Sequence, residues 1–260
     1  MELRDTVAIV TGGARGIGRG IAIELAKEGA RIAVADLPST AADRDATIAA
    51  VRKAGSDAFA IDVDVRDFAQ DQTMVKAAID RWGKVDILVN NAGVISVGIV
   101  AMLAEEDWDR VLDVNLKGTF LCSKAVAPHM MERRSGRIVN LSSMAGKRGN
   151  AGVSHYCASK WGVIGFTQSL AHEMGPFNVT VNAVCPGEVD TYMWRDVLNP
   201  AIAAATGTTP DEAWKATIAQ RVPLGRPQTA EDIGQAVVFL CNADNITGES
   251  VNVTGGSEMA

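Results

Sequence analysis

The chain has few of the residues that build disulfide frameworks or metal centres. Its 260 residues include four cysteines and three histidines, and no two cysteines form a CxxC pair. The cysteines, Cys122, Cys157, Cys185 and Cys241, are widely spaced, so we expect small packing residues rather than disulfide partners or zinc ligands. No metal site is therefore predicted.

Long apolar runs and an excess of positive charge are also missing. No run of about 18 apolar residues occurs, so no membrane span is predicted. The first residues lack the basic and apolar regions of a secretory signal, and we expect a cytoplasmic protein. A net charge of −6 gives no electrostatic footprint for nucleic acid or an anionic membrane. Small molecules are the expected partners.

What the chain does have is apolar sequence for a large core, 47% of its residues. Buried-strand runs alternate with amphipathic stretches, a pattern typical of a parallel sheet covered on both faces. We predict one α/β domain over residues 1–260. The predicted strands are Val7–Thr11, Arg31–Asp36, Ala58–Val63, Ile87–Asn90, Arg137–Leu141, Val179–Val184 and Ser250–Val253. The predicted helices are Gly16–Glu28, Ala41–Ala54, Gln70–Trp82, Glu105–Met131, Tyr156–Met174 and Ala230–Leu240.

One segment, residues 192–227, departs from this alternation. Within it, Thr209-Pro210-Asp211-Glu212 is a helix start, with a capping threonine and proline at the first helical position. We expect a mostly helical lid over a pocket. The alternative is a surface excursion without a role.

A glycine-rich loop, Thr11-Gly12-Gly13-Ala14-Arg15-Gly16-Ile17-Gly18, joins the first strand to the first helix. Glycines let the backbone approach a pyrophosphate, and the helix N-terminus supplies free N–H groups. In this strand-to-helix setting the motif predicts dinucleotide binding.

Asp36 and Arg15 point to different forms of that dinucleotide. Asp36 ends the second strand, where a carboxylate accepts hydrogen bonds from the adenosine ribose and repels a 2′-phosphate. Arg15 could instead attract the phosphate. We give Asp36 more weight, because its charge must be neutralised before a phosphate binds, and we predict NAD as cofactor.

Three further segments follow strands at the same predicted sheet edge. Asp64-Val65 could contact the adenine, or Asp64 could be a solvated turn acid. The small and amide residues of Asn90-Asn91-Ala92-Gly93 suit a backbone that passes close to a ligand. Pro186-Gly187-Glu188-Val189-Asp190-Thr191 lies where a nicotinamide could be held.

Tyr156 and Lys160 form the candidate catalytic pair. Residues four apart on a helix share a face, and a neighbouring cation lowers the pKa of a phenol, which is about 10 when free. Ser143, thirteen residues earlier, could hydrogen-bond a substrate oxygen. Taken alone, YxxxK is more often a snorkelling lysine beside a packed tyrosine. For Asn115, a helix-bending amide is the bland explanation.

Taken together, these motifs resemble those of short-chain dehydrogenases/reductases over essentially the whole chain. TGxxxGxG, NNAG, the asparagine of VNLKG, the serine before YxxxK, and PGxxxT stand in the family's order. The resemblance implies a single Rossmann-type, doubly wound sheet, often assembled as a homotetramer through two long helices and the C-terminal segment. It implies Tyr156 as general acid/base, Lys160 as the group that lowers its pKa and holds the nicotinamide ribose, Ser143 as the group that positions the substrate oxygen, and Asn115 as support for a proton relay. The implied cofactor contacts are Gly12, Ile17, Asp36, Asp64, Val65, Asn91, Val189 and Thr191.

We therefore predict an NAD-dependent oxidoreductase acting on a secondary alcohol or ketone. Val94, Met144, Asn150, His155, Glu188 and Trp194 are predicted substrate contacts. Glu188 would accept hydroxyl hydrogen bonds, which favours a small polyol, sugar alcohol or vicinal diol. The segment after the sixth strand resembles that of bacterial butanediol and sugar-alcohol dehydrogenases.

Two alternatives stay open. The whole chain also resembles 3-oxoacyl thioester reductases, although those should favour NADPH and a basic docking face. From another class, a non-catalytic dinucleotide-binding sensor or scaffold could use the same fold. The basic cluster of Arg133, Arg134 and Arg137 is interpreted as a solvated helix end rather than a docking face.

Overall fold

The computed structural model describes residues 1–259 and contains a seven-stranded parallel sheet within them. The strand order across the sheet is β3-β2-β1-β4-β5-β6-β7. From β1, the chain adds β2 and β3 on one side and then returns to add β4 to β7 on the other side, so the order of addition reverses between β1 and β4. Ala260, the last residue of the predicted domain, lies outside the described residues. The strands are β1 (Val7–Thr11), β2 (Arg31–Asp36), β3 (Ala58–Asp62), β4 (Ile87–Asn90), β5 (Gly136–Leu141), β6 (Val179–Pro186) and β7 (Ser250–Val253).

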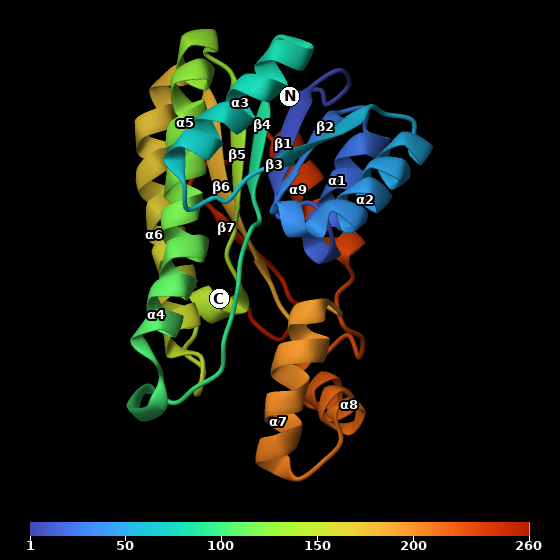
Figure 1. Ribbon diagram of the computed structural model, residues 1–260, viewed down its shortest axis with the longest axis vertical. Helices are drawn as coiled ribbons and strands as arrows, with labels where there is room; N and C mark the ends of the chain where they lie inside the picture. Colours follow the sequence, from blue (N-terminus) through green and yellow to red (C-terminus); the bar gives the residue numbers. More distant parts are fainter. Residues whose placement is uncertain (260) are drawn as a thin grey trace.

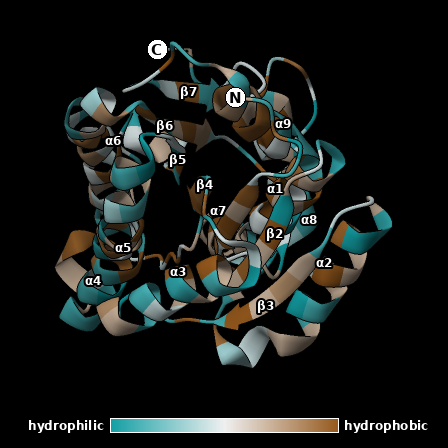
Figure 2. Cartoon of the chain, turned by 90° about the horizontal axis from the view of Figure 1, so that it is seen from above, coloured by the Kyte–Doolittle hydropathy of each residue, from teal (hydrophilic) through white to brown (hydrophobic). Residues whose placement is uncertain are grey.

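Two helical layers cover the sheet (Figures 1 and 2). One layer holds α1 (Gly16–Lys27), α2 (Ala41–Lys53) and α9 (Ala230–Asn242), and the other holds α3 (Phe68–Trp82), α5 (Gly118–Arg133) and α6 (Ser154–Met174). In β1, Ala8 and Val10 pack into the first layer, and Val7 and Ile9 into the second. This alternation arises because successive strand side chains point to opposite faces. The predicted parallel, doubly wound sheet is confirmed.

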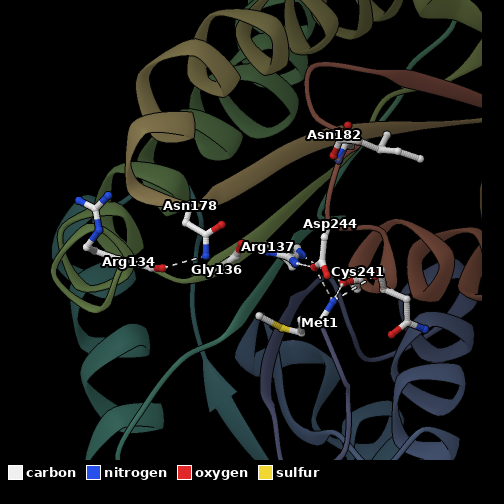
Figure 3. A network of polar contacts seen from close by, with 10 residues as sticks. Met1, Arg134, Gly136, Arg137, Asn178, Asn182, Cys241 and Asp244 are labelled. Atoms are coloured by element: carbon white, nitrogen blue, oxygen red, sulfur yellow. Dashed lines mark hydrogen bonds and ion pairs between the residues drawn. The ribbon is translucent and has the colours of Figure 1, made fainter.

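The amino-terminal edge of the sheet is fastened by paired charges (Figure 3). The Met1 ammonium donates to the Cys241 carbonyl at 3.2 Å and to Asp244 Oδ1 at 2.9 Å. Arg137, 4% exposed, donates from Nε to the same carbonyl and is ion-paired with Asp244. The interpretation of Arg137 as solvated is therefore wrong: its position in a central strand buries it.

One predicted helix contains a π-helical segment. The stretch Glu105–Met131 forms α4 (Glu105–Leu112), a π-helical segment (Asp113–Lys117) and α5. Asn115 lies in the π-helical segment, and its side chain bonds the backbone of Val94. A π-bulge inserts an extra residue into a helical turn and is frequent at functional sites.

The predicted insertion is mostly helical. It contains a π-helical segment (Met193–Leu198), α7 (Asn199–Thr206) and α8 (Pro210–Arg221), where Thr209 and Glu212 form the expected capping box. These helices project beyond the carboxyl edge of the sheet (Figure 1). The Trp194 and Trp214 rings, with centroids 5.2 Å apart, pack the π-helical segment against α8. Over residues 1–259, no helix combines the length and apolarity needed to cross a bilayer.

Candidate active site

A cavity of about 920 Å³ lies at the carboxyl edge of the sheet. Its wall includes the glycine-rich loop, the ends of β2 to β6, and the helical insertion. The strand order reverses between β1 and β4, and open α/β sheets bind ligands at such a switch point. The topology thus brings the predicted motifs together.

The glycine-rich loop needs its glycines. Gly12 has φ +61°, and a Cβ there would lie 2.8 Å from the Ala92 Cα. A Cβ on Gly18 would lie 2.1 Å from the Gly12 carbonyl oxygen. Asn91 closes the loop against β4, because its Nδ2 donates to the carbonyls of Thr11 (2.9 Å) and Gly12 (3.0 Å). These contacts hold the N-terminus of α1 open toward the cavity.

Asp36 and Arg15 both line the cavity but differ in their contacts. The Asp36 carboxylate accepts the N–H groups of Ala14 (3.0 Å) and Leu37 (2.8 Å), which fixes its position at the end of β2. The exposed Arg15 guanidinium lies 4.6 Å from the centroid of the Tyr192 ring. This stacking directs Arg15 toward the insertion.

Asp64 and Val65 also lie on the wall. The Asp64 carboxylate accepts Arg66 Nη2 at 2.5 Å, and the hydrogen bond from this guanidinium lowers the pKa of Asp64. Asp64 is therefore a charged, ion-paired turn residue that still faces the cavity. Val189, Thr191, Ile17 and Gly16 line it as well, and a Cβ on Gly16 would lie 3.6 Å from the Thr191 side chain. The segment after β6 thus sits directly against the glycine-rich loop.

Tyr156, Lys160 and Ser143 converge on the cavity wall. Tyr156 is 9% exposed and its hydroxyl is hydrogen-bonded with Ser143, which begins the short helical turn after β5. The Lys160 ammonium, 4% exposed, donates to the Leu141 carbonyl at 2.8 Å and lies 5.6 Å from the Tyr156 ring centroid.

Asn115 joins this cluster through its side chain. Its Oδ1 accepts the Val94 N–H at 2.8 Å, and its Nδ2 donates to Ser159 Oγ at 3.1 Å. Ser159 in turn donates to the Tyr156 carbonyl at 2.7 Å. Asn115 therefore ties the loop after β4 to the helix that carries Tyr156. The four predicted catalytic residues are assembled in one region.

Burial governs the ionisation of the pair. Burial raises the pKa of Tyr156 to about 12, against the lowering effect of the Ser143 hydrogen bond. Burial also lowers the pKa of Lys160 to about 8. The lowering of the Tyr156 pKa expected from Lys160 is not found in this structure, because desolvation of the phenolate raises that pKa. At neutral pH Tyr156 therefore holds its proton.

The predicted substrate contacts divide into two groups. Val94, Met144, Asn150 and Trp194 lie on the cavity wall. Glu188 and His155 do not: both are fully buried, and neither side chain lines the cavity. His155 Nε2 lies 2.8 Å from Ser96 Oγ, and burial lowers the pKa of this imidazole.

Glu188 turns away from the cavity toward the C-terminal segment. Its Oε2 accepts the Ser257 hydroxyl at 2.9 Å, while Oε1 is buried without a hydrogen-bond partner. Its neighbours Gly187 and Val189 line the cavity, and successive residues of an extended segment point to opposite sides. The prediction that Glu188 contacts substrate is therefore wrong in this structure.

The sequence reasoning missed a wall made by the insertion. Leu198, Ala201, Ile202 and Ala205 line the cavity, and their spacing places them on one helical face. That spacing was present in the sequence, but alanine-rich helices carry a weak amphipathic signal. Val97 and Ile99, in the loop after β4, were also missed.

The residues of this cavity fit a nicotinamide dinucleotide. The cradle at Gly12 and Gly18 leaves no room for a Cβ but leaves α1 N–H groups free for a pyrophosphate. Asp36 suits a ribose diol, and Lys160 lies beside the loop after β4, where a Cβ on Gly93 would be 3.6 Å from its Nζ. One cavity thus contains the Asp36 carboxylate, which suits the adenosine ribose, and the Tyr156 and Lys160 side chains, which suit the nicotinamide end of the dinucleotide.

Comparison with known proteins agrees with this geometry. A family model described as short chain dehydrogenase matches residues 6–201. The chain belongs to the short-chain dehydrogenase family, whose members are oxidoreductases that use a nicotinamide cofactor.

Individual relatives cover nearly the full chain. Galactitol 2-dehydrogenase of Agrobacterium fabrum is 42% identical over 263 residues, covering 100% of both chains. A 3-oxoacyl-(acyl-carrier-protein) reductase of Staphylococcus aureus is 39% identical over 254 residues, covering 97% of this chain and 98% of the relative. The crystal structure of levodione reductase superposes with a TM-score of 0.90 at 32% identity, covering 97% of each chain.

Proposed function

We propose that the protein is an NAD-dependent oxidoreductase that interconverts a secondary alcohol and a ketone. The observation that carries this proposal is the convergence of Ser143, Tyr156 and Lys160 at one end of a cavity whose other end holds Asp36. A sensor or scaffold would need the dinucleotide end alone. The buried proton-bearing pair is costly to maintain and favours a catalyst.

The chain's own residues manage the proton and the positions of the reactants. When bound, the nicotinamide ring supplies the hydride donor or acceptor. In alcohol oxidation the deprotonated Tyr156 oxygen would take the hydroxyl proton, and in ketone reduction the protonated Tyr156 hydroxyl would give that proton to the substrate oxygen. Ser143 positions the substrate oxygen by hydrogen bonding, and Lys160 holds the nicotinamide ribose. Asn115 fixes the helix turn from which Tyr156 projects, and supports proton relay to solvent.

NAD is preferred over NADP in this proposal because of Asp36. Two backbone N–H groups hold its carboxylate at the end of β2, where a 2′-phosphate would meet a like charge. Arg15, the cation that could offset that charge, is stacked on Tyr192. Gly12, Ile17, Asp64, Val65, Asn91, Val189 and Thr191 are the other proposed cofactor contacts.

Kinetics with both cofactors test the cofactor assignment. We expect Asp36→Ala to move the NAD to NADP ratio of kcat/KM toward NADP by at least about 10-fold, since like-charge contacts cost several kcal/mol. Asp45→Ala, an exposed acid on α2, is the matched control and should leave the ratio unchanged. A wild-type preference for NADP would contradict the assignment.

Two relatives support two different substrate classes. The relative named galactitol 2-dehydrogenase supports a polyol or vicinal diol, whereas the argument from Glu188 no longer does. The relative named 3-oxoacyl-(acyl-carrier-protein) reductase supports the thioester alternative. Absorbance of the reduced nicotinamide, followed with diols, polyols and an acetoacetyl thioester, separates these candidates and also excludes a non-catalytic protein if any turnover occurs.

We also propose a homotetramer built through α5, α6 and the C-terminal segment. Phe120 on α5 and Trp161 on α6 are 43% and 53% exposed, and Phe120 packs edge-to-face on Phe166. Exposed aromatic groups on neighbouring helices are typical of interfaces. Light scattering during gel filtration measures the assembly directly.

A further inference from the structure

The catalytic tyrosine is surrounded by hydrocarbon on the substrate side. Val94, Ile95, Val153 and Met193 pack against a small cluster that contains Tyr156 and Ala145. All six residues also line the cavity. The part of a substrate next to its reacting oxygen therefore meets apolar side chains.

The insertion extends this apolar surface away from Tyr156. Leu198, Ala201, Ile202 and Ala205 line the cavity from one side of the π-helical segment and α7. The rings of Trp194 and Trp214, tilted by 50° to each other, pack that segment against α8. This wall of the cavity is therefore a helical face kept in place by packing, and few of its side chains could hydrogen-bond a hydroxyl group.

The loop after β4 supplies the opposite wall and its rim. Val97 and Ile99 line the cavity while 44% and 62% exposed, and the adjoining Val100 and Met102 are 74% and 79% exposed. The Gly98 N–H donates to the Gly152 carbonyl at 2.8 Å, which holds this loop against the segment after β5. Exposed apolar groups gathered at a cavity mouth commonly mark a binding site for an apolar partner.

Hydrogen-bonding groups are sparse in these walls. Apart from Ser143 and Tyr156, the side chains on these walls that can form hydrogen bonds are Asn150, Tyr192, Trp194 and Arg221, and Arg110 also lines the cavity. Glu188, which would have added a carboxylate, is buried against Ser257. Each substrate hydroxyl buried without a partner would lower affinity roughly tenfold to a hundredfold. A compound hydroxylated along its whole length is therefore a poor fit.

We propose that the substrate carries its reactive oxygen, with at most one adjacent oxygen, at one end of a bulky apolar body. The oxygen end lies at Ser143 and Tyr156, and the body lies between the insertion face and the loop after β4. This inference rests on the proposed secondary alcohol and ketone chemistry and selects within it.

A matched pair of six-membered rings tests the proposal. Cyclohexane-1,2-diol has two adjacent hydroxyls and an apolar remainder, whereas myo-inositol has a hydroxyl on every carbon. With the purified protein and each oxidised cofactor, we expect kcat/KM for the cyclohexanediol to exceed that for myo-inositol and for galactitol by at least about 100-fold. Equal or better use of either polyol would overturn the inference.

Two substitutions on α7 locate the effect in the wall. Ile202→Gln places an amide in the apolar face and should raise KM for the cyclohexanediol by about 10-fold with little change in kcat. Ala204→Gln is the control, because Ala204 is exposed on the same helix and does not line the cavity. Equal effects of the two substitutions would overturn the assignment of this wall.

The outcomes also separate this inference from the proposed function. Turnover of galactitol with an inert cyclohexanediol would overturn the substrate class and leave the dehydrogenase proposal intact. Efficient reduction of an acetoacetyl thioester with inert diols would do the same in favour of the thioester alternative. The absence of turnover of any alcohol, ketone or thioester with either cofactor would overturn both.

Discussion

The two edges of the sheet treat buried polar groups in opposite ways. At the amino edge, Asp86 is 3% exposed and accepts Arg133 and Lys84, each at 2.9 Å, together with the Val7 N–H. At the carboxyl edge, Lys160 is equally buried, yet none of the ion pairs within residues 1–259 includes it.

This difference separates groups that hold the fold from groups that we propose to be catalytic. Burial lowers the pKa of Lys160 to about 8 and raises that of Tyr156 to about 12. Perturbed pKa values of this kind cluster at functional sites, because burying an ionisable group without a partner does not stabilise the fold. Substitutions at the two edges should accordingly affect different properties.

The largest expected effect belongs to Tyr156. Tyr156→Phe removes the hydroxyl that exchanges a proton with the substrate oxygen, so kcat should fall by about 10²- to 10⁴-fold. Cofactor affinity, measured by fluorescence titration, should stay within a few-fold. Tyr192→Phe is the matched control, because Tyr192 is the chain's other tyrosine and its ring would still stack on Arg15. Substantial turnover by Tyr156→Phe would refute its role.

The amino edge should respond in stability instead. Asp86→Ala leaves Arg133 and Lys84 without their carboxylate and the Val7 N–H without its acceptor, so unfolding free energy should fall by about 3 kcal/mol. Asp80→Ala, which breaks an exposed pair with Lys76, should cost about 0.3–0.5 kcal/mol. Denaturant unfolding measures both. Turnover per folded molecule should be unchanged. A loss of kcat without a loss of stability would contradict the assignment of the amino edge to folding.

Glu188 gives a smaller effect and sharpens the comparison. Its carboxylate accepts the Ser257 hydroxyl, so Glu188→Ala should lower stability by about 1–2 kcal/mol through the lost hydrogen bond. KM for the alcohol should change by less than about twofold, because Glu188 does not line the cavity and its loss removes no contact with the bound substrate. Glu249→Ala, at an exposed acid, is the control. An unchanged melting curve together with a raised KM would show that Glu188 contacts the substrate after all.

Much of the fold could be predicted because it depends on local patterns. The apolar runs of the seven strands and the capping residues at Thr209 are short-range signals, and all of these elements occur where expected. The π-helical segment at Asn115 could not be predicted, although the sequence indicates a helix-bending amide, because the Asn115 side chain bonds the backbone of Val94, 21 residues earlier.

The site shows the same division. The motif order was enough to bring Gly12, Asp36, Tyr156 and Lys160 to one cavity. Glu188 was misplaced because a motif fixes a backbone position, whereas the direction of its side chain depends on packing against Ser257, 69 residues away. The ionisation of Tyr156 was misjudged for a related reason: proximity to a cation is visible in the sequence, but the depth of burial is not.

The pH dependence of alcohol oxidation tests the central claim most directly. Oxidation needs Tyr156 to accept a proton, and burial favours its protonated form, so the reactive fraction is small at neutral pH and grows as pH rises. We predict that kcat/KM for alcohol oxidation rises steadily from pH 7 to pH 10 in the wild-type protein, and that Tyr156→Phe abolishes this rise along with the rate. A flat profile, or a rise of the same size in Tyr156→Phe, would contradict the assignment of Tyr156 as the group that takes the substrate's proton.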